Sequence, residues 1–243
     1  MKHKFLTSAS LGVAALALAA CGTATSSGNG VSTLSPTNAE AVVTQAILHA
    51  HSVHMVIAVT QGGSTTTQTF DSNQQGGRRV VTINGQNATI LVTPKAAYLD
   101  ATAPILTANF GLSSTVAAHD SGKWLSLPAG SSGYTSLANG VTIANLAQAV
   151  AISKVTRKAH VALNGVAVTE LDGTSVGGKL AIVVPVVGSA LPLEGSISGS
   201  GITVSLKFSH WGETVDLTPP GNSTPFPASA LTSPPTTTAT AAG

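Results

Sequence analysis

Charged side chains are scarce in this sequence. Only 8% of its 243 residues are Asp, Glu, Lys or Arg, whereas about 25% is typical of soluble domains. Lys2 and Lys4 belong to an N-terminal leader, and removing these two from 11 basic residues leaves nine, against nine acidic ones. The pairs at residues 78–79 and 157–158 are the only adjacent Lys or Arg residues, and we interpret both as solvated strand ends. A nucleic-acid surface needs clustered basic residues, so we predict no nucleic-acid partner.

Cysteine and aromatic residues are scarce too. Cys21 is the single cysteine, which excludes a disulfide within the chain. Aromatic residues make up 4% of the sequence, but hydrophobic residues make up 43%. Such a chain can bury a large aliphatic core while Ser, Thr and Asn keep its surface hydrated. Downstream of the leader, no apolar run is long enough to span a bilayer.

The leader has the features of a secretory signal. Lys2 and Lys4 precede an apolar run that ends in the motif LAAC at residues 18–21, and the run is too short for a stable membrane span. The motif resembles the lipobox of bacterial lipoproteins, in which the cysteine becomes the acylated first residue. We therefore predict a signal peptide over residues 1–20 and lipidation of Cys21. Each buried methylene contributes about 0.8 kcal/mol, so several acyl chains would anchor the protein on the extracytoplasmic side of the cell membrane.

The remainder of the chain divides into a tether, one domain and a tail. Residues 21–36 are rich in Gly, Ser and Thr, which is typical of a flexible tether. Residues 37–220 begin with a helical pattern and continue as about ten short alternating strands with two helical insertions. This pattern predicts an α+β domain whose antiparallel sheet is covered on one side by helices. Residues 221–243 are mainly Pro, Thr, Ser and Ala, so we predict a disordered tail.

Four short motifs occur in order along the domain. They are HSVHMV at residues 51–56, AYLD at 97–100 with GKW at 122–124, the hairpin at 161–172, and LKFSHWGETV at 206–215 followed by TPP at 218–220. Together these motifs resemble the LppX/LprAFG family of actinobacterial lipoproteins, which share a LolA-like fold. The resemblance implies a strongly curved antiparallel half-barrel, short helices over its concave face and a hydrophobic cavity between them. It also implies an acylated lipid or glycolipid as ligand and an envelope transporter as a further partner.

Two alternating strands and the first helical insertion supply the candidate lining of that cavity. The insertion is too apolar to lie exposed on a soluble surface, and we predict that the site lies between it and the concave face of the sheet. The candidate ligand-binding residues are Val53, Met55, Ile57, Val59, Ile105, Leu106, Phe110, Leu112, Ile202, Val204, Leu206 and Phe208.

Other chemistries are less well supported by the sequence. The motif GTSVG at residues 173–177 matches a nucleophile elbow, but a strand-like run follows it where that chemistry needs a helix, which favours a hairpin. His49, His51 and His54 have no carboxylate close in sequence, which favours solvated residues near a helix end over zinc ligands. Trp211 stands beside a glycine, which favours a packed turn with its indole N–H bonded to the backbone. We predict no catalytic residue, no metal, no cofactor and no enzyme activity.

The function most consistent with these patterns is that of a membrane-anchored envelope lipoprotein that binds or carries an acylated lipid or glycolipid. A mostly apolar cavity requires few charges and no catalytic constellation. The alternative is a structural or protein-interaction lipoprotein whose core is closed and holds no ligand, and a hydrolase is the third hypothesis. A lipid found by mass spectrometry in protein purified without its anchor would separate the first two.

Replacement of the lipobox cysteine tests the anchor. Cys21→Ala should move the protein out of the membrane fraction or leave it as an unprocessed precursor, because no residue remains to carry the acyl chains. Fractionation with radiolabelled palmitate measures both effects. Unchanged acyl labelling of the variant would contradict lipidation of Cys21, and no labelling of the parent chain would favour an ordinary signal peptide with a chance cysteine.

Overall fold

The computed structural model of the chain describes residues 28–227, except residues 84 and 176. The predicted signal peptide, the lipidation of Cys21 and the part of the predicted tail from residue 228 onward lie outside these residues. Within them, no helix is both long and apolar enough to cross a membrane.

Five short helices and twelve strands form the described part of the chain. The helices are α1 (Pro36–His49), α2 (Ala103–Phe110), α3 (Ser114–Asp120), α4 (Ser132–Ala138) and α5 (Ile143–Ala149). The strands are β1 (Ser52–Gln61), β2 (Ser64–Asn73), β3 (Gly77–Ile83), β4 (Gln86–Val92), β5 (Ala96–Ala101), β6 (Trp124–Pro128), β7 (Ser153–Leu163), β8 (Val166–Ser175), β9 (Gly178–Pro185), β10 (Glu194–Gly199), β11 (Ile202–Ser209) and β12 (Ser223–Pro225).

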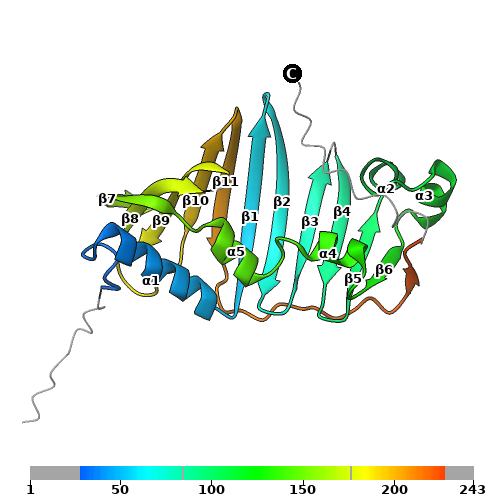
Figure 1. The fold of residues 1–243 in the computed structure, drawn as a ribbon, viewed down its shortest axis with the longest axis horizontal. Helices are drawn as coiled ribbons and strands as arrows, with labels where there is room; N and C mark the ends of the chain where they lie inside the picture. Colours follow the sequence, from blue (N-terminus) through cyan, green and yellow to red (C-terminus); the bar gives the residue numbers. More distant parts are fainter. Residues whose placement is uncertain (1–27, 84, 176, 228–243) are drawn as a thin grey trace, which may run out of the picture.

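All twelve strands belong to one open sheet. Their order is β12-β6-β5-β4-β3-β2-β1-β11-β10-β9-β8-β7. Every neighbouring pair is antiparallel except β12 and β6, which run parallel. Figure 1 shows a curved, unclosed sheet with α1, α4 and α5 in front of the lower half of its concave face. The predicted α+β half-barrel, with short helices over its concave face, is confirmed.

Two long connections run across the strands of the sheet. The chain leaves β6 near one edge and reaches β7 at the other edge through α4 and α5, so these helices cross the concave face. After β11 pairs with β1 in the middle of the sheet, the chain runs back along the lower edge to β12 beside β6 (Figure 1). We call residues 210–222 of this return the strap.

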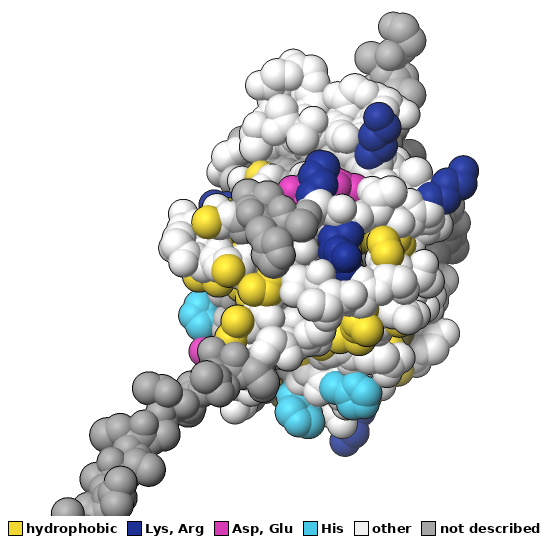
Figure 2. All heavy atoms as spheres, turned by 90° about the vertical axis from the view of Figure 1, so that its left-hand side faces the viewer, with side chains coloured by type: hydrophobic (Ala, Val, Ile, Leu, Met, Phe, Trp, Pro, Cys, Tyr) yellow, Lys and Arg dark blue, Asp and Glu magenta, His cyan; other side chains and the backbone are white. Residues whose placement is uncertain are grey.

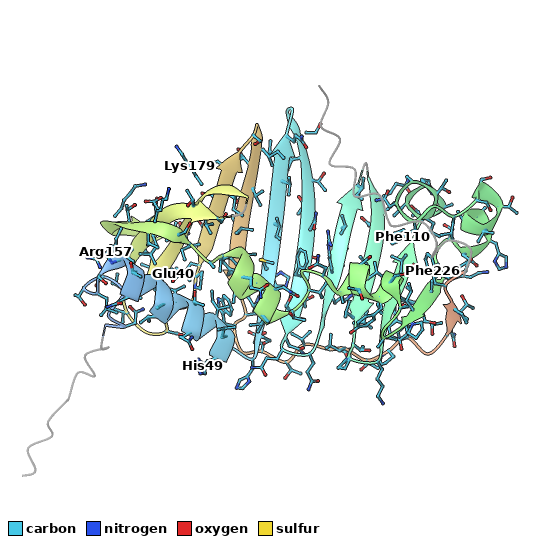
Figure 3. All side chains as sticks on the ribbon, viewed as in Figure 1. Glu40, His49, Phe110, Arg157, Lys179 and Phe226 are labelled. Carbon is cyan, nitrogen blue, oxygen red and sulfur yellow. The ribbon has the colours of Figure 1, made fainter. Side chains whose placement is uncertain are left out.

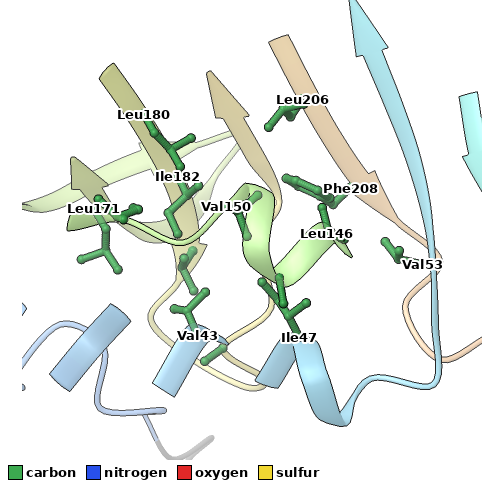
Figure 4. Close-up of a cluster of buried hydrophobic side chains, with 14 of the residues drawn as sticks. Val43, Ile47, Val53, Leu146, Val150, Leu171, Leu180, Ile182, Leu206 and Phe208 are labelled. Carbon is green, nitrogen blue, oxygen red and sulfur yellow. The ribbon is translucent and has the colours of Figure 1, made fainter. Parts of the chain in front are cut away.

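The buried apolar side chains form two separate clusters on the concave side. The larger cluster joins α1 and α5 to β1, β8, β9 and β11, and its labelled members in Figure 4 converge from both helices and the strands. The smaller cluster joins α2, α3 and α4 to β4, β5 and β6. Helical periodicity explains how α1 joins the larger cluster, because Ala39, Val43 and Ile47 share one face of the helix and are buried there.

Ordered structure extends beyond the predicted domain at its N-terminal end. Val31 is completely buried in the larger cluster, and the amide of Asn29 donates a hydrogen bond of 2.6 Å to the carbonyl of Pro185. Helix α1 then begins at Pro36, where the Ser35 side chain caps it by accepting from the N–H of Asn38. The predicted tether is therefore shorter, because a buried valine and the hydrogen bond from Asn29 hold a segment whose composition is typical of a linker.

The domain also extends beyond its predicted C-terminal boundary at residue 220. Strand β12 falls within the predicted tail, and Phe226 directly after it is only 8% exposed. The Phe226 ring meets the ring of Phe110 edge to face, with 6.1 Å between centroids (Figure 3). The Phe226 ring and the pairing of β12 with β6 together hold this Pro- and Thr-rich segment on the domain.

The surface reflects the composition. In the view of Figure 2, onto the end of the molecule formed by α1 and β7, most atoms belong to backbone or uncharged polar groups, and charged side chains are scattered. Lys158 lies at this end and bridges Glu170 at 2.8 Å and Asp172 at 3.1 Å. Both carboxylates raise the pKa of Lys158, chiefly by accepting hydrogen bonds from its ammonium group.

Phe226 provides a test of the C-terminal closure. Phe226→Ala should lower the free energy of unfolding by roughly 3 kcal/mol, since the lost ring leaves a cavity in the smaller cluster. Urea unfolding measures the change, and a chain that ends after Pro227 is the matched control that should keep full stability. Equal stability of Phe226→Ala and the parent chain would show that β12 is not docked.

Candidate functional site

The candidate site lies on the concave face of the sheet. Strand register assigns each residue to a face, because side chains alternate along a strand. One row across this face reads Phe208, Met55, Phe70, Arg79 and Ile90 on five successive strands. Its members point toward the helices, whereas residues one position along each strand point to the opposite face.

The lower half of the concave face is a packed core. Val53, Met55, Leu206 and Phe208 are between 1% and 6% exposed and lie in the cluster that α1 and α5 cover (Figure 4). Surface this inaccessible leaves no space beside these side chains for a ligand. We therefore assign these four candidate residues to the core beneath the site.

The insertion does not face these strands, contrary to the predicted arrangement. Ile105, Leu106 and Leu112 are buried, and Phe110 partly so, in the smaller cluster against β4, β5 and β6. Strand order explains the difference, because β1 and β11 lie in the middle of the sheet whereas β6 lies near one edge. The twelve candidate residues thus form two groups, and the structure does not join them into one site.

The upper half of the concave face is less covered. The remaining candidates, Ile57, Val59, Ile202 and Val204, are half-buried, and Ile197 of β10 joins them through its pairing with Val204. In Figure 1 the strands β1, β2 and β11 rise above α5, and no helix lies in front of their upper parts. We call these five residues the open strip.

A cation lies on the same face, two strands from β1 and one row below Ile57 of the open strip. Arg79 of β3 is half-buried, and its Nε and Nη2 atoms donate to Oε1 of Gln68 at 3.1 and 2.8 Å. Its guanidinium carbon lies 5.2 Å from the centre of the Phe70 ring, within the range of a cation–π contact. Burial lowers the pKa of Arg79, because desolvation disfavours its charged form.

Arg79 has no acidic partner among the described residues. The ion pairs there join His54 to Asp71, His119 to Asp120, and Lys158 to two carboxylates. Within β1–β6 and β9–β11, Arg79 is also the only charged residue whose register places it on the concave face. Interpreting residues 78–79 together as a solvated strand end was therefore wrong for Arg79, and period-two alternation was the signal that could have separated the two.

A second depression lies on the opposite face. It is a cleft of about 580 Å³ between the sheet and the strap, lined among others by His54, Arg78, Trp124 and Asp216. His54 Nδ1 lies 2.6 Å from Asp71 Oδ1. The lining carries charges of both signs, so this cleft is unsuited to an acyl chain.

The histidine motif does not form a metal site. His49 Nδ1 contacts the carbonyl of Gln45 at 2.7 Å at the end of α1, and His54 pairs with Asp71. No group of three or more His, Cys, Asp or Glu able to hold a metal occurs among residues 28–227 as far as they are described.

The two other motifs form turns. The nucleophile-like motif at 173–177 lies in the hairpin between β8 and β9, which pair up to Ser175 and Gly178. This confirms the predicted hairpin, and no helix follows the serine. The predicted packed turn at Trp211 is also confirmed, because its indole Nε1–H donates to the carbonyl of Pro192 at 3.1 Å and its ring stacks on Phe208.

Comparison with known proteins gives likeness of fold only. No protein-family model and no curated protein matches the chain. Among solved structures, LprF from Mycobacterium bovis is 18% identical with a TM-score of 0.46, over 74% of this chain and 94% of that one. The Mycobacterium tuberculosis lipoprotein LppX is 16% identical with a TM-score of 0.46, over 74% of this chain and 97% of that one. These values describe the path of the chain and carry no information on what its side chains bind.

The connection between α4 and α5 closes the lower border of the site. Its contact with the sheet at Gly77 can be tested by substitution. A Cβ at residue 77 would lie 2.6 Å from the carbonyl oxygen of Asp71 and 2.9 Å from two atoms of Val141. Gly77→Ala should therefore lower the free energy of unfolding by about 1–3 kcal/mol. Gly221→Ala is the control, because a Cβ there would meet nothing within 4 Å. Urea unfolding that leaves both variants equally stable would contradict this packing.

Proposed function

We propose that this protein is an envelope lipoprotein that is anchored through Cys21 and binds an acylated lipid on its concave face. The observation that supports this proposal is the open strip. Its five aliphatic side chains continue the buried face of the sheet, yet the helices leave them half-buried. An acyl chain laid on the strip would remove this surface from water, which contributes about 25 cal/mol per Å² of apolar area.

The composition of the face favours a lipid over a water-soluble ligand. Binding sites for polar molecules present several convergent polar groups. Here Gln68 and Arg79 lie at one end, and the open strip itself is wholly aliphatic. We therefore propose a chain-like apolar ligand that lies across the strands and carries its polar group at the β2–β3 side.

The structural alternative remains specific enough to test. In that hypothesis the protein has a closed core and holds no ligand. The packed lower half of the concave face is compatible with it, because Val53, Met55, Leu206 and Phe208 are already buried in one cluster with residues of α1 and α5. The two hypotheses differ in what a large side chain would do in the open strip.

Val204→Trp separates the two hypotheses. Val204 pairs with Val59 on the concave face and is half-buried, so the indole would occupy the place of the proposed acyl chain. We expect stability to fall by less than the roughly 1–3 kcal/mol of core overpacking, and binding of a fluorescent fatty acid to be lost. Thr203→Trp is the matched control, because Thr203 is exposed on the opposite face, and it should bind like the parent chain.

Two measurements decide the outcome of this pair. Urea unfolding gives the stability, and fluorescence titration gives the affinity for the fatty acid. A loss of 1–3 kcal/mol or more in Val204→Trp would favour the closed core. Absence of lipid binding by the parent chain, together with no lipid in the purified protein by mass spectrometry, would overturn the proposal.

A further inference from the structure

Gln68 and Phe70 surround the guanidinium group of Arg79, but no described acidic residue balances its positive charge. A half-buried charge loses hydration, which is costly unless an opposite charge or hydrogen bonds replace the water. The side-chain oxygen of Gln68 supplies part of that replacement, and the Phe70 ring supplies another part. Neither is an anion, and no described carboxylate lies within ion-pair distance of Arg79.

The two contacts leave one edge of the guanidinium group without a hydrogen-bond acceptor among the described residues. Of its five N–H donors, Gln68 engages one on Nε and one on Nη2. The described residues accept no hydrogen bond from Nη1 or from the second hydrogen of Nη2. These donors form the end-on fork that binds both oxygens of a carboxylate. Because Gln68 and Phe70 already restrict the side chain, little further ordering is needed on binding.

We propose that Arg79 binds the carboxylate of a long-chain fatty acid whose acyl chain lies along the open strip. This inference rests on the proposed function and names its ligand class. Interstrand spacing of about 4.8 Å places the four steps from β3 to β10 about 19 Å apart, which suits an extended long acyl chain. The chain would pass Ile57, Val59 and Val204 before it reaches Ile197 on β10.

The surroundings of Arg79 favour a small head group. Val141, between α4 and α5, contacts the face of Gly77 closely enough that a Cβ there would lie 2.9 Å from it. Gly77 lies two residues before Arg79 and on the same face of β3. The connection therefore closes the face below Arg79, whereas the guanidinium group bonds on the other side to Gln68, which pairs with Val81. Gln68 leaves one bidentate edge of the group free of an acceptor, and the two oxygens of a single carboxylate match such an edge.

Competition binding with three probes tests the inference on the processed chain. Palmitate, its uncharged methyl ester and palmitoyl lysophosphatidic acid each displace a fluorescent acyl probe. The parent chain should bind palmitate tenfold or more tighter than the methyl ester, because a hydrogen-bonded ion pair of this kind is worth that factor. Arg79→Gln should lose this preference while it keeps its affinity for the methyl ester.

Arg78→Gln is the matched control for charge. Arg78 is adjacent in sequence but exposed on the opposite face, so its replacement should leave the preference for palmitate unchanged. Arg79→Lys keeps the charge without the planar fork and should retain only part of the preference. Thermal unfolding of each variant verifies that it is folded. If Arg79→Gln does not fold, the palmitate preference of Arg79→Lys provides the test instead.

Three results would overturn the inference, and they are distinguishable. Equal binding of palmitate and methyl ester by the parent chain would refute the role of Arg79 and leave lipid binding in place. Tighter binding of lysophosphatidic acid than of palmitate would identify a phosphate ligand instead. No binding of any probe would refute the proposed function together with this inference.

Discussion

The crossover from β6 to β7 determines how much of the concave face is covered. These strands lie ten steps apart in the sheet, about 48 Å at the usual interstrand spacing. The connecting segment must bridge this distance, and its two helices, α4 and α5, lie along the way. One such passage covers a single stripe of the face. Helix α1 widens the stripe near β7, and the rest of the aliphatic surface stays accessible.

Much of the fold could be predicted from local patterns. Alternation along β1 and β11 identified the face that carries Met55 and Phe208, and the hairpin around residues 173–177 followed from the strand-like run after it. Strand order could not be predicted, because it depends on pairings between distant segments. The helical insertion was consequently placed opposite the wrong strands. Arg79 was overlooked because adjacency to Arg78 obscured the alternation that puts them on opposite faces.

Both ends of the domain bury one apolar side chain, beside backbone hydrogen bonds, in segments of linker-like composition. Val31 fixes the approach to α1, and Phe226 fixes the chain after β12. Composition averages over a window and does not register one anchoring residue. A few side-chain hydrogen bonds also hold the strap between β11 and β12. The Ser52 hydroxyl donates to the carbonyl of Glu213, and the Trp211 indole donates to the carbonyl of Pro192.

The two lateral edges of the sheet also matter for how the protein behaves at high concentration. Strand β12 is three residues long and ends in a proline, so it offers few free backbone groups. At the other edge, β7 carries Lys154 and Lys158 and two irregularities in its pairing with β8. Short strands, prolines, lysines and bulges all discourage pairing with a neighbouring sheet. An open half-barrel can therefore be crowded beside its own copies without growing into a continuous cross-molecular sheet.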